Sequence, residues 1–325
     1  MVTIKDVSKE AGIAVGTVSR VLNNRGYISE ETRQKVARAM QKLNYQPNEM
    51  ARSLSKQKSS IIGLVIPQIE NPYFATLTKY IERSASTYGY QILLFLSDGK
   101  MQTEERLIEQ CKKDRVAGII MCSGLCHVTP FNDLGCPLIT IERALDTGTS
   151  AILCDNYEGG ALATQYLIDR GCKYLLHLSG VVGNEMPADR RALGFIDTCK
   201  KNGVIHIEAP FSEELYERME YMEFLEEIFA LHSDIDGVFT SNDIIAAQVL
   251  QLCARSHIAV PEQLKIVGFD DIPLARWTVP MLTTIKQPIP EMAEMAVRAL
   301  IDAQDGKSVP KEIRMAVKLI ERESA

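Results

Sequence analysis

Three residues near the N-terminus have types and spacing that suit contact with DNA: Gly16, Thr17 and Arg20. Apolar residues at helical spacing predict a helix over residues 15–22, and these three lie together on its other face. A glycine allows close approach, a hydroxyl reaches phosphates or base edges, and a guanidinium binds either group in the major groove. The alternative is a small helical domain whose Arg20 is merely solvated, because single arginines are usually surface residues.

A second set of polar and aromatic residues follows the carboxyl ends of predicted buried strands. In doubly wound sheets, ligands bind beyond these strand ends. Aromatic rings and convergent hydrogen-bonding groups suit a small polyhydroxylated or heterocyclic molecule there. The set comprises Asn71, Tyr73, Phe74, Asp98, Glu142, Arg143, Asn242, Asp270 and Gln287. For each acid the alternative is turn capping, and Asp98 in particular precedes a glycine.

The N-terminal residues predict three short helices that would position the DNA-contacting face. Apolar residues recur at helical spacing in the first two, and Gly12 stands where a helix C-terminus needs a left-handed residue. Ser29 precedes two glutamates, which is typical of a helix N-terminus, and this third helix should end near Asn44, shortly before a proline. A headpiece of residues 1–46 is therefore expected.

From residue 61 the sequence alternates buried strands with amphipathic helices. This alternation predicts parallel sheets in βαβ units. The predicted strands are IIGLVIP, YQILLFLS, VAGIIMC and PLITIE in a first series, and KYLLHLSG, DGVFTSN and LKIVGFDD in a second. Helices are expected near residues 74–88, 103–114, 160–170, 191–202, 214–231, 245–256 and 291–302. The two series indicate two doubly wound lobes.

Composition and motifs argue against several classes of protein. No apolar run reaches the roughly 20 residues of a membrane helix, and the charged N-terminus is unlike a signal peptide, so a cytoplasmic protein without membrane contact is expected. The eight cysteines are scattered, which favours reduced core residues. Phosphate-loop, nucleophile-elbow and zinc-protease motifs are absent, and the cluster of Cys122, Cys126 and His127 lacks a second ligand pair. We therefore predict no catalytic residue, cofactor or metal.

The net charge of −6 is unevenly distributed along the chain. Residues 1–60 carry eleven Lys/Arg and five Asp/Glu, a net +6, whereas the other 265 residues carry a net −12. A basic head on an acidic body allows phosphate binding at one end while DNA repels the rest. A uniformly acidic enzyme would not show this division.

The first sixty residues resemble the DNA-binding headpiece of the LacI/GalR family of bacterial transcription regulators. The resemblance rests on the ordered blocks TIKDVSKEAG, TVSRVLN, SEETRQKVARAMQKLNY and PNEMARSL. One departure is Ala14, where the family commonly has a serine that caps the helix and reaches a phosphate; losing a cap typically costs about 1 kcal/mol. The remainder resembles the family's core. The resemblance thus implies a small all-α helix-turn-helix DNA-binding domain plus an α/β, two-lobed, periplasmic-binding-protein-like core of two doubly wound parallel sheets.

The resemblance also implies a hinge helix and linker in residues 47–60. In the family this segment pairs with its dimer mate in the minor groove, and Leu54 fits the apolar side chain that enters a base step. The alternative is a plain linker whose Leu54 packs on the body. The expected DNA-binding set is Thr3, Val15, Gly16, Thr17, Ser19, Arg20, Asn23, Asn48 and Leu54.

In the family's core the chain crosses between the lobes three times. By resemblance the crossings fall near Asn156, Thr284 and Ala316. The expected N-terminal lobe is then residues 61–155 plus 284–312, and the expected C-terminal lobe is residues 156–283 plus 313–325. Because no leucine heptad follows the last predicted strand, a homodimer is favoured over a tetramer.

Family members that bind sugars or purines use several of the strand-end positions. Arg191 opens RALGF, which resembles the family's R-x-x-G-F, and Phe211 in APFSEE resembles an aromatic that stacks on a ligand ring. At Glu142 the family often has the shorter aspartate before Arg143. The expected effector-binding set is Asn71, Tyr73, Phe74, Asp98, Arg143, Arg191, Phe211, Asn242, Asp270 and Gln287.

Together these features predict a sequence-specific, DNA-binding transcription regulator. We expect a dimeric repressor of a carbohydrate-utilisation operon, whose affinity for double-stranded operator DNA is controlled by a sugar or sugar phosphate between the lobes. Two alternatives stay open within the same family: control by a nucleoside or purine, and control by a protein partner without a sugar effector. A transport protein or sugar-converting enzyme would need an export signal or a catalytic motif.

Overall fold

The computed structural model describes residues 2–22, 26–45, 59–122, 134–143, 149–181 and 186–325. The chain forms two compact units, Met1–Ser59 and Ser60–Ala325. Most of the predicted hinge lies outside the described residues, as do the predicted DNA-binding residues Asn23, Asn48 and Leu54.

The described residues of the first unit form three helices: α1 (Ile4–Ala11), α2 (Val15–Leu22) and α3 (Glu30–Lys42). Their apolar faces meet in a core of Val7, Val18, Val36 and Ala39. Gly12 has φ 64° at the end of α1, and the Ser29 hydroxyl accepts a hydrogen bond from the Thr32 amide at the start of α3. Both predicted helix ends are thus confirmed.

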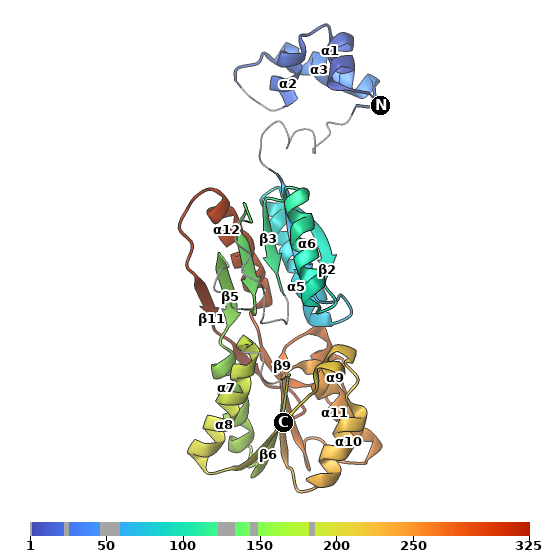
Figure 1. Ribbon diagram of the computed structural model, residues 1–325. Coiled ribbons are helices and arrows are strands. Elements are labelled where there is room, and N and C mark those ends of the chain that lie inside the picture. Colours follow the sequence, from blue (N-terminus) through green and yellow to red (C-terminus); the bar gives the residue numbers. More distant parts are fainter. Residues whose placement is uncertain (1, 23–25, 46–58, 123–133, 144–148, 182–185) are drawn as a thin grey trace. The chain divides into compact units, whose positions relative to one another are not determined.

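The second unit contains two six-stranded sheets, one in each lobe (Figure 1). The first sheet has the order β11-β5-β4-β3-β1-β2 and its pairs are parallel. Its strands are β1 (Ile61–Ile66), β2 (Gln91–Leu96), β3 (Gly118–Met121), β4 (Leu138–Ile141), β5 (Ser150–Cys154) and β11 (Glu312–Met315). The helices of this first lobe are α5 (Pro72–Thr87), α6 (Met101–Lys113) and α12 (Ile289–Gln304).

The second sheet has the order β12-β10-β9-β8-β6-β7, in which β12 pairs antiparallel with β10 and the other pairs are parallel. Its strands are β6 (Tyr174–Ser179), β7 (Ile205–Pro210), β8 (Gly237–Thr240), β9 (Lys265–Asp270), β10 (Thr283–Lys286) and β12 (Lys318–Ile320). The helices of this second lobe are α7 (Asn156–Asp169), α8 (Arg190–Asn202), α9 (Glu213–Arg218), α10 (Met222–Leu231) and α11 (Asp243–Arg255). Short 3-10 turns, η1 (Pro187–Asp189) and η2 (Pro273–Arg276), precede α8 and follow β9.

The central strands are buried on both faces, which explains their continuous apolar sequences. On β1, Leu64 packs in the cluster that includes α5 and α12, whereas the next residue, Val65, packs with Ile108 and Cys111 of α6. Helices therefore cover both sides of the first sheet. The two parallel-dominated sheets confirm the predicted fold class.

The strand order corrects two of the predicted lobe boundaries by a few residues. Thr284 lies within β10 and pairs with Gly268, so the chain is still in the second sheet there. Ile313 lies within β11 and pairs with Ile152 of the first sheet. The returning segment of the first lobe therefore begins after β10 and includes β11, because a crossing falls between strands and not inside one.

One predicted helix is broken into two. The periodicity over residues 214–231 suggested one helix, but α9 ends at Arg218 and α10 begins at Met222. Met219 has a left-handed backbone with φ 53°, which a continuing helix cannot contain. The break matters because residues on both sides of it line the cavity described below.

The described part of the chain contains no membrane-spanning helix, disulfide bond or metal-binding cluster. No described helix is long and apolar enough to cross a membrane. Seven cysteines are described as free, and all but Cys136 are buried. Cys126 and His127 lie outside the described residues, and the described ones contain no group of three or more acidic, His or Cys side chains arranged to hold a metal.

Candidate functional site

A cavity of about 590 Å³ lies between the two lobes of the core. We refer to it as the interlobe cavity. One wall consists of residues that follow β1, β2, β3 and β4 of the first sheet, and the other of residues that follow β6, β8 and β9 of the second. Eight predicted effector-binding side chains line it: Asn71, Tyr73, Phe74, Asp98, Arg191, Asn242, Asp270 and Gln287. The strand-end rule selected seven of these eight, and the family resemblance supplied Arg191.

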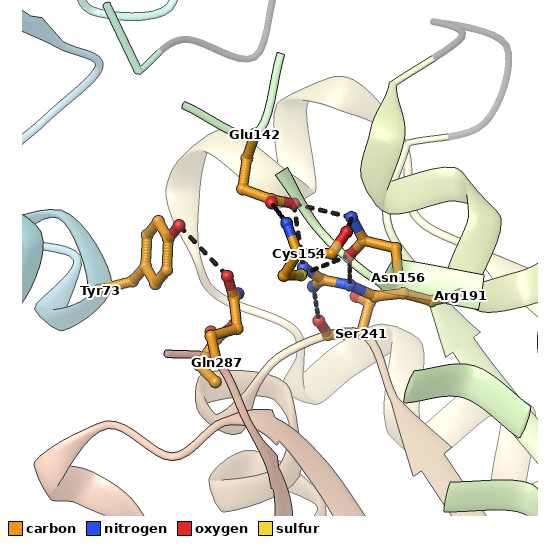
Figure 2. A network of polar contacts seen from close by, with 8 residues as sticks. Tyr73, Glu142, Cys154, Asn156, Arg191, Ser241 and Gln287 are labelled. Carbon is orange, nitrogen blue, oxygen red and sulfur yellow. Dashed lines mark hydrogen bonds and ion pairs between the residues drawn. The ribbon is translucent and has the colours of Figure 1, made fainter. Parts of the chain in front are cut away.

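Arg191 is held by a network of polar contacts between β4, α7 and α8 (Figure 2). Its Nε donates to Asn156 Oδ1 at 2.7 Å, and its Nη1 donates to the Ser241 carbonyl at 2.5 Å. Glu142 Oε2 lies 3.8 Å from Arg191 Nη2 and accepts the Asn156 amide at 2.8 Å. The guanidinium also stacks on Phe269, 3.6 Å from the ring centroid. Side chains held on several sides in this way present fixed hydrogen-bonding groups to the cavity.

Asp270 and Gln287 form a second polar pair, and Tyr73 reaches it from the first lobe. Gln287 Nε2 donates to Asp270 Oδ1 at 2.6 Å, and the Tyr73 hydroxyl donates to Gln287 Oε1 at 3.4 Å (Figure 2 shows the contact with Tyr73). Burial raises the pKa of Asp270 to about 7, although Arg191 and the Gln287 hydrogen bond act in the opposite direction. A buried carboxyl group with its second oxygen available is suited to bind a ligand hydroxyl.

Three of the acidic residues lining the cavity have positive φ angles. They are Asp98 at 52°, Glu142 at 53° and Asp270 at 115°. Each ends a strand or follows it within two residues, at β2, β4 and β9. Non-glycine residues adopt this conformation only where the surrounding structure enforces it, and such positions cluster at ligand-binding sites. The backbone thus indicates a site built for function at this edge of both sheets.

Two predicted effector-binding residues do not line the interlobe cavity. Arg143 is 1% exposed and its Nη1 contacts Glu104 Oε2 and Met121 Sδ, each at 3.1 Å. Glu142, the first residue after β4, lines the cavity in its place.

Phe211 is the second predicted residue that does not line the cavity, because it packs in the core of the second lobe. Its ring centroid lies 4.5 Å from that of Tyr221 and 4.9 Å from that of Phe224. Tyr216 and Tyr221, on either side of the break between α9 and α10, line the cavity instead. The sequence predicted one continuous helix here, so the two tyrosines were not identified as cavity residues.

Several other charged residues line the cavity and were missed from the sequence. They are Glu70, Lys100, Asp189 and Arg218. Lys100 lies four residues after the end of β2 and two after the left-handed Asp98. Asp98 was predicted from the sequence, but the residues beyond it were not. Asp189 is the last residue of the η1 turn, two residues before Arg191. The sequence around it has no apolar periodicity that would indicate a position at the cavity.

In the headpiece, α2 exposes the face that the sequence predicted to contact DNA. Val15, Gly16 and Arg20 are exposed, whereas Val18 on the opposite face is fully buried. Thr17 is half-buried and accepts a hydrogen bond from Arg20 Nη2 at 3.4 Å. A Cβ on Gly16 would meet no atom within 4 Å. Packing of the headpiece therefore does not require a glycine there, which is consistent with a surface that another molecule approaches closely.

The remaining described members of the DNA-binding set are Thr3 and Ser19. Thr3 is exposed and stands before α1, where its backbone amide donates to Asp6 Oδ2 at 2.8 Å. Ser19 is half-buried on α2.

A three-helix headpiece followed by a two-lobed core with a polar cavity defines the class of a ligand-binding protein with a helix-turn-helix unit. Comparison with known proteins identifies the family. Residues 3–48 match the family of bacterial regulatory proteins of the lacI type, and residues 164–325 match a periplasmic binding protein-like domain.

Relatives of similar length support the same assignment. The chain is 35% identical to the ribose operon repressor of Halalkalibacterium halodurans, over 100% of this chain and 97% of that protein. It is 32% identical to the sucrose operon repressor of Streptococcus mutans, over 99% and 98% of the two chains. The chain belongs to the LacI family, and it is a DNA-binding transcription regulator with a ligand-binding core.

Solved structures show the same fold. A LacI-type regulator of Alkaliphilus metalliredigens in complex with D-xylulofuranose is 31% identical, with a TM-score of 0.74 over 82% of this chain and 99% of that one. The lac repressor dimer bound to operator and an anti-inducer is 22% identical, with a TM-score of 0.87 over 99% and 98% of the two chains. The second comparison establishes the fold alone.

Proposed function

We propose that this regulator, acting as a homodimer, represses a carbohydrate-utilisation operon, and that a neutral sugar in the interlobe cavity controls its affinity for operator DNA. The observation that best supports this proposal is the convergence of Arg191, Asp270 and Gln287 on one cavity between two lobes. Guanidinium, carboxyl and amide groups bind the hydroxyls of a polyol, and Tyr73 and Phe74 can stack on its apolar face.

The charges of the cavity favour a free sugar over a sugar phosphate. Its described lining contains five acidic side chains and three basic ones. The acids are Glu70, Asp98, Glu142, Asp189 and Asp270, and the bases are Lys100, Arg191 and Arg218. A phosphate group would therefore meet a net negative surface. The names of the ribose and sucrose relatives, and the D-xylulofuranose bound to a similar core, agree with a neutral sugar.

The longer Glu142 does not prevent use of the cavity. Because the family often has Asp at this position, the longer Glu made a contact with a ligand hydroxyl less certain and kept the protein-partner alternative open. Its carboxylate accepts hydrogen bonds from the Cys154 amide at 2.5 Å and from Asn156 at 2.8 Å. Glu142 thus supports the Arg191 network from the first lobe, and the cavity keeps its hydrogen-bonding groups.

The proposed mechanism depends on groups from both lobes contacting one ligand. Tyr73 belongs to the first lobe and Asp270 to the second, so a sugar between them favours closure of the lobes. Closure changes the separation of the two residue 47–60 segments in a dimer, and with it the cost of ordering them on DNA. Coupling of this kind is typically about 1 to 3 kcal/mol, or roughly 5- to 150-fold in affinity. We propose no catalytic activity and no cofactor, and a cytoplasmic location, where the operator lies.

Titration calorimetry of the full-length chain tests the ligand class. The panel is D-ribose, sucrose, D-ribose 5-phosphate and adenosine, each against the parent and two neighbouring variants. Gln287→Ala should weaken sugar binding at least tenfold, whereas Lys286→Ala, in an exposed position, should leave it unchanged. Binding of adenosine alone would favour the purine alternative, and no binding of any compound would favour a protein partner.

Fluorescence anisotropy with labelled DNA tests whether the chain binds its promoter specifically and whether a sugar changes that affinity. The full-length chain is titrated into a labelled fragment of its own upstream promoter and into random duplex of equal length, with and without the sugar identified by calorimetry. Preference for the promoter fragment and a sugar-dependent change in its dissociation constant are expected. Equal affinity for both duplexes under every condition would contradict the proposal, and sedimentation of the same samples reports whether the chain is dimeric.

A further inference from the structure

A second cavity, of about 460 Å³, lies beside η1 and the start of α8. We call it the side cavity. It is lined by the ends of β5 and β11 from the first lobe and by β6, β7 and α8 from the second. Gly180, Met186, Ala188 and Asp189 border both cavities, so the segment around η1 separates them. The ligand proposed above uses only the interlobe cavity.

Three buried polar side chains line the side cavity without hydrogen-bond partners in the described part of the chain. They are His177, with no partner at Nε2, and Ser179 and Ser241, with none at Oγ. Their exposures are 0%, 4% and 6%. Buried polar groups in native proteins are nearly always paired, so three such groups beside one cavity need an explanation. A ligand that supplies the missing hydrogen bonds would provide it.

The surroundings of His177 define which hydrogen bond is missing. Its ring stacks on Phe239 with centroids 4.6 Å apart, and its Nδ1 lies 3.0 Å from the Phe239 carbonyl oxygen. Because a carbonyl only accepts, Nδ1 carries the proton and donates. Burial lowers the pKa of His177 to about 3, so the ring is neutral at pH 7 and Nε2 is an acceptor. The site therefore requires a ligand that donates a hydrogen bond.

The remaining lining selects against an anion. The described lining of the side cavity contains three acidic residues, Asp189, Glu208 and Glu312, and two basic ones, Arg190 and Arg314. Arg314 is already paired with Glu312 at 2.6 Å. The lining also contains apolar side chains, among them Leu153, Leu193 and Ile196. Hydroxyl donors on one side and C–H groups on the other are the two faces of a small cyclic polyol.

We propose that the side cavity is a second binding site, which takes a small neutral polyol whose hydroxyls bond to His177 Nε2 and to the Ser179 and Ser241 hydroxyls. The cavity is within the size range of known small-ligand sites and exceeds the volume of a single monosaccharide. The two sites do not compete for the same atom of Ser241, because its hydroxyl belongs to this site and its carbonyl binds Arg191.

Nitrogen NMR of the histidine rings in the full-length chain tests this proposal, with myo-inositol as the probe and sodium sulfate as the anionic comparison. The resonance of His177 Nε2 is identified by its loss in His177→Phe, a variant that keeps an aromatic ring between Phe239 and Phe195. If that variant does not fold, replacing the other four histidines with Gln identifies the resonance instead.

We expect myo-inositol to shift this resonance in a saturable way. Ser179→Ala should weaken the apparent affinity at least fivefold, whereas Ser256→Ala, an exposed serine at the end of α11, should leave it unchanged. Gln287→Ala, which acts only on the interlobe cavity, should also leave it unchanged.

Four results would overturn the proposal. They are no shift with myo-inositol, the same shift in Ser179→Ala, loss of the shift in Gln287→Ala, and a shift with sulfate alone. The first means that the buried groups bond to water only. The third means that the interlobe site produced the signal, and it leaves the function proposed above intact.

Discussion

The backbone carbonyl of Tyr157 in α7 lies so close to Gly194 in α8 that a Cβ on Gly194 would stand 2.1 Å from it. A reciprocal contact exists at Gly160, where a Cβ would stand 2.1 Å from the Arg191 carbonyl. The two helices therefore touch through their backbones. Since Asn156 begins α7 and Arg191 lies in the first turn of α8, this contact sets the separation at which the two side chains meet.

Gly194→Ala should separate α7 from α8 and disturb the Arg191 network. We expect a loss of about 1 to 3 kcal/mol in the free energy of unfolding, which is typical of overpacking. We also expect sugar affinity to fall, because Arg191 moves away from Asn156 and the cavity. Chemical denaturation and calorimetry measure the two effects. Lys200→Ala, on the exposed side of α8, is the control, and a Gly194→Ala variant with parental affinity and stability would refute the prediction.

Asp270 should make stability depend on pH in a defined direction. Its pKa is about 7 in the folded chain because of burial, whereas 3.8 is the ordinary value for Asp. Between these values the folded chain holds a proton that the unfolded chain has lost, so the free energy of unfolding falls as pH rises from about 4 to 7. The contribution is on the order of a few kcal/mol. In Asp270→Asn this part of the decline should be missing, as measured by urea denaturation at several pH values; parallel curves for the two proteins would argue against it.

Much of the fold followed from the sequence because the central strands are buried on both faces. Continuous apolar runs such as IIGLVIP predict that environment directly, and Gly12 and Ser29 mark helix ends by chemistry local to the chain. The crossing after β10 was placed too early because strand pairing decides where the chain leaves a sheet. Pairing of Thr284 with Gly268 joins residues whose sequences give no sign of it.

The candidate site was predictable where strand ends mark it, and unpredictable where tertiary packing decides. Asp98, Asn242 and Asp270 follow or end strands, so the rule for doubly wound sheets located them. Arg143 is the next residue after Glu142, but it is buried against Glu104 of α6, and this contact exists only in the folded chain. The side cavity has no sequence signal, because its unpaired polar atoms come from β6 and from the residue after β8, and they meet only in the folded chain.

Gly16→Glu should abolish specific DNA binding without unfolding the headpiece. A side chain fits in the folded chain because no atom lies within 4 Å of the added Cβ, and glycine is a poor residue inside a helix. At a DNA interface the same side chain adds bulk and a negative charge facing phosphates. We expect at least a tenfold loss of operator affinity with an unchanged melting temperature. The control is Gln41→Glu, which makes the same charge change at an exposed position on α3; equal losses in both variants would show a purely electrostatic effect.

Arg20→Ala should weaken binding to the operator more than binding to random duplex, and so reduce discrimination between the two. Arg20 is exposed on the predicted DNA-contacting face, and a bidentate contact between an arginine and guanine contributes about 1 to 3 kcal/mol of discrimination. The ratio of the two dissociation constants should therefore fall roughly 5- to 150-fold. Lys35→Ala removes one exposed positive charge from α3 and should leave the ratio unchanged. A phosphate contact at Arg20 would instead weaken binding to both duplexes equally and lower the salt dependence by about one ion per contact. Anisotropy titrations at three salt concentrations separate these outcomes, since only a base contact changes the ratio.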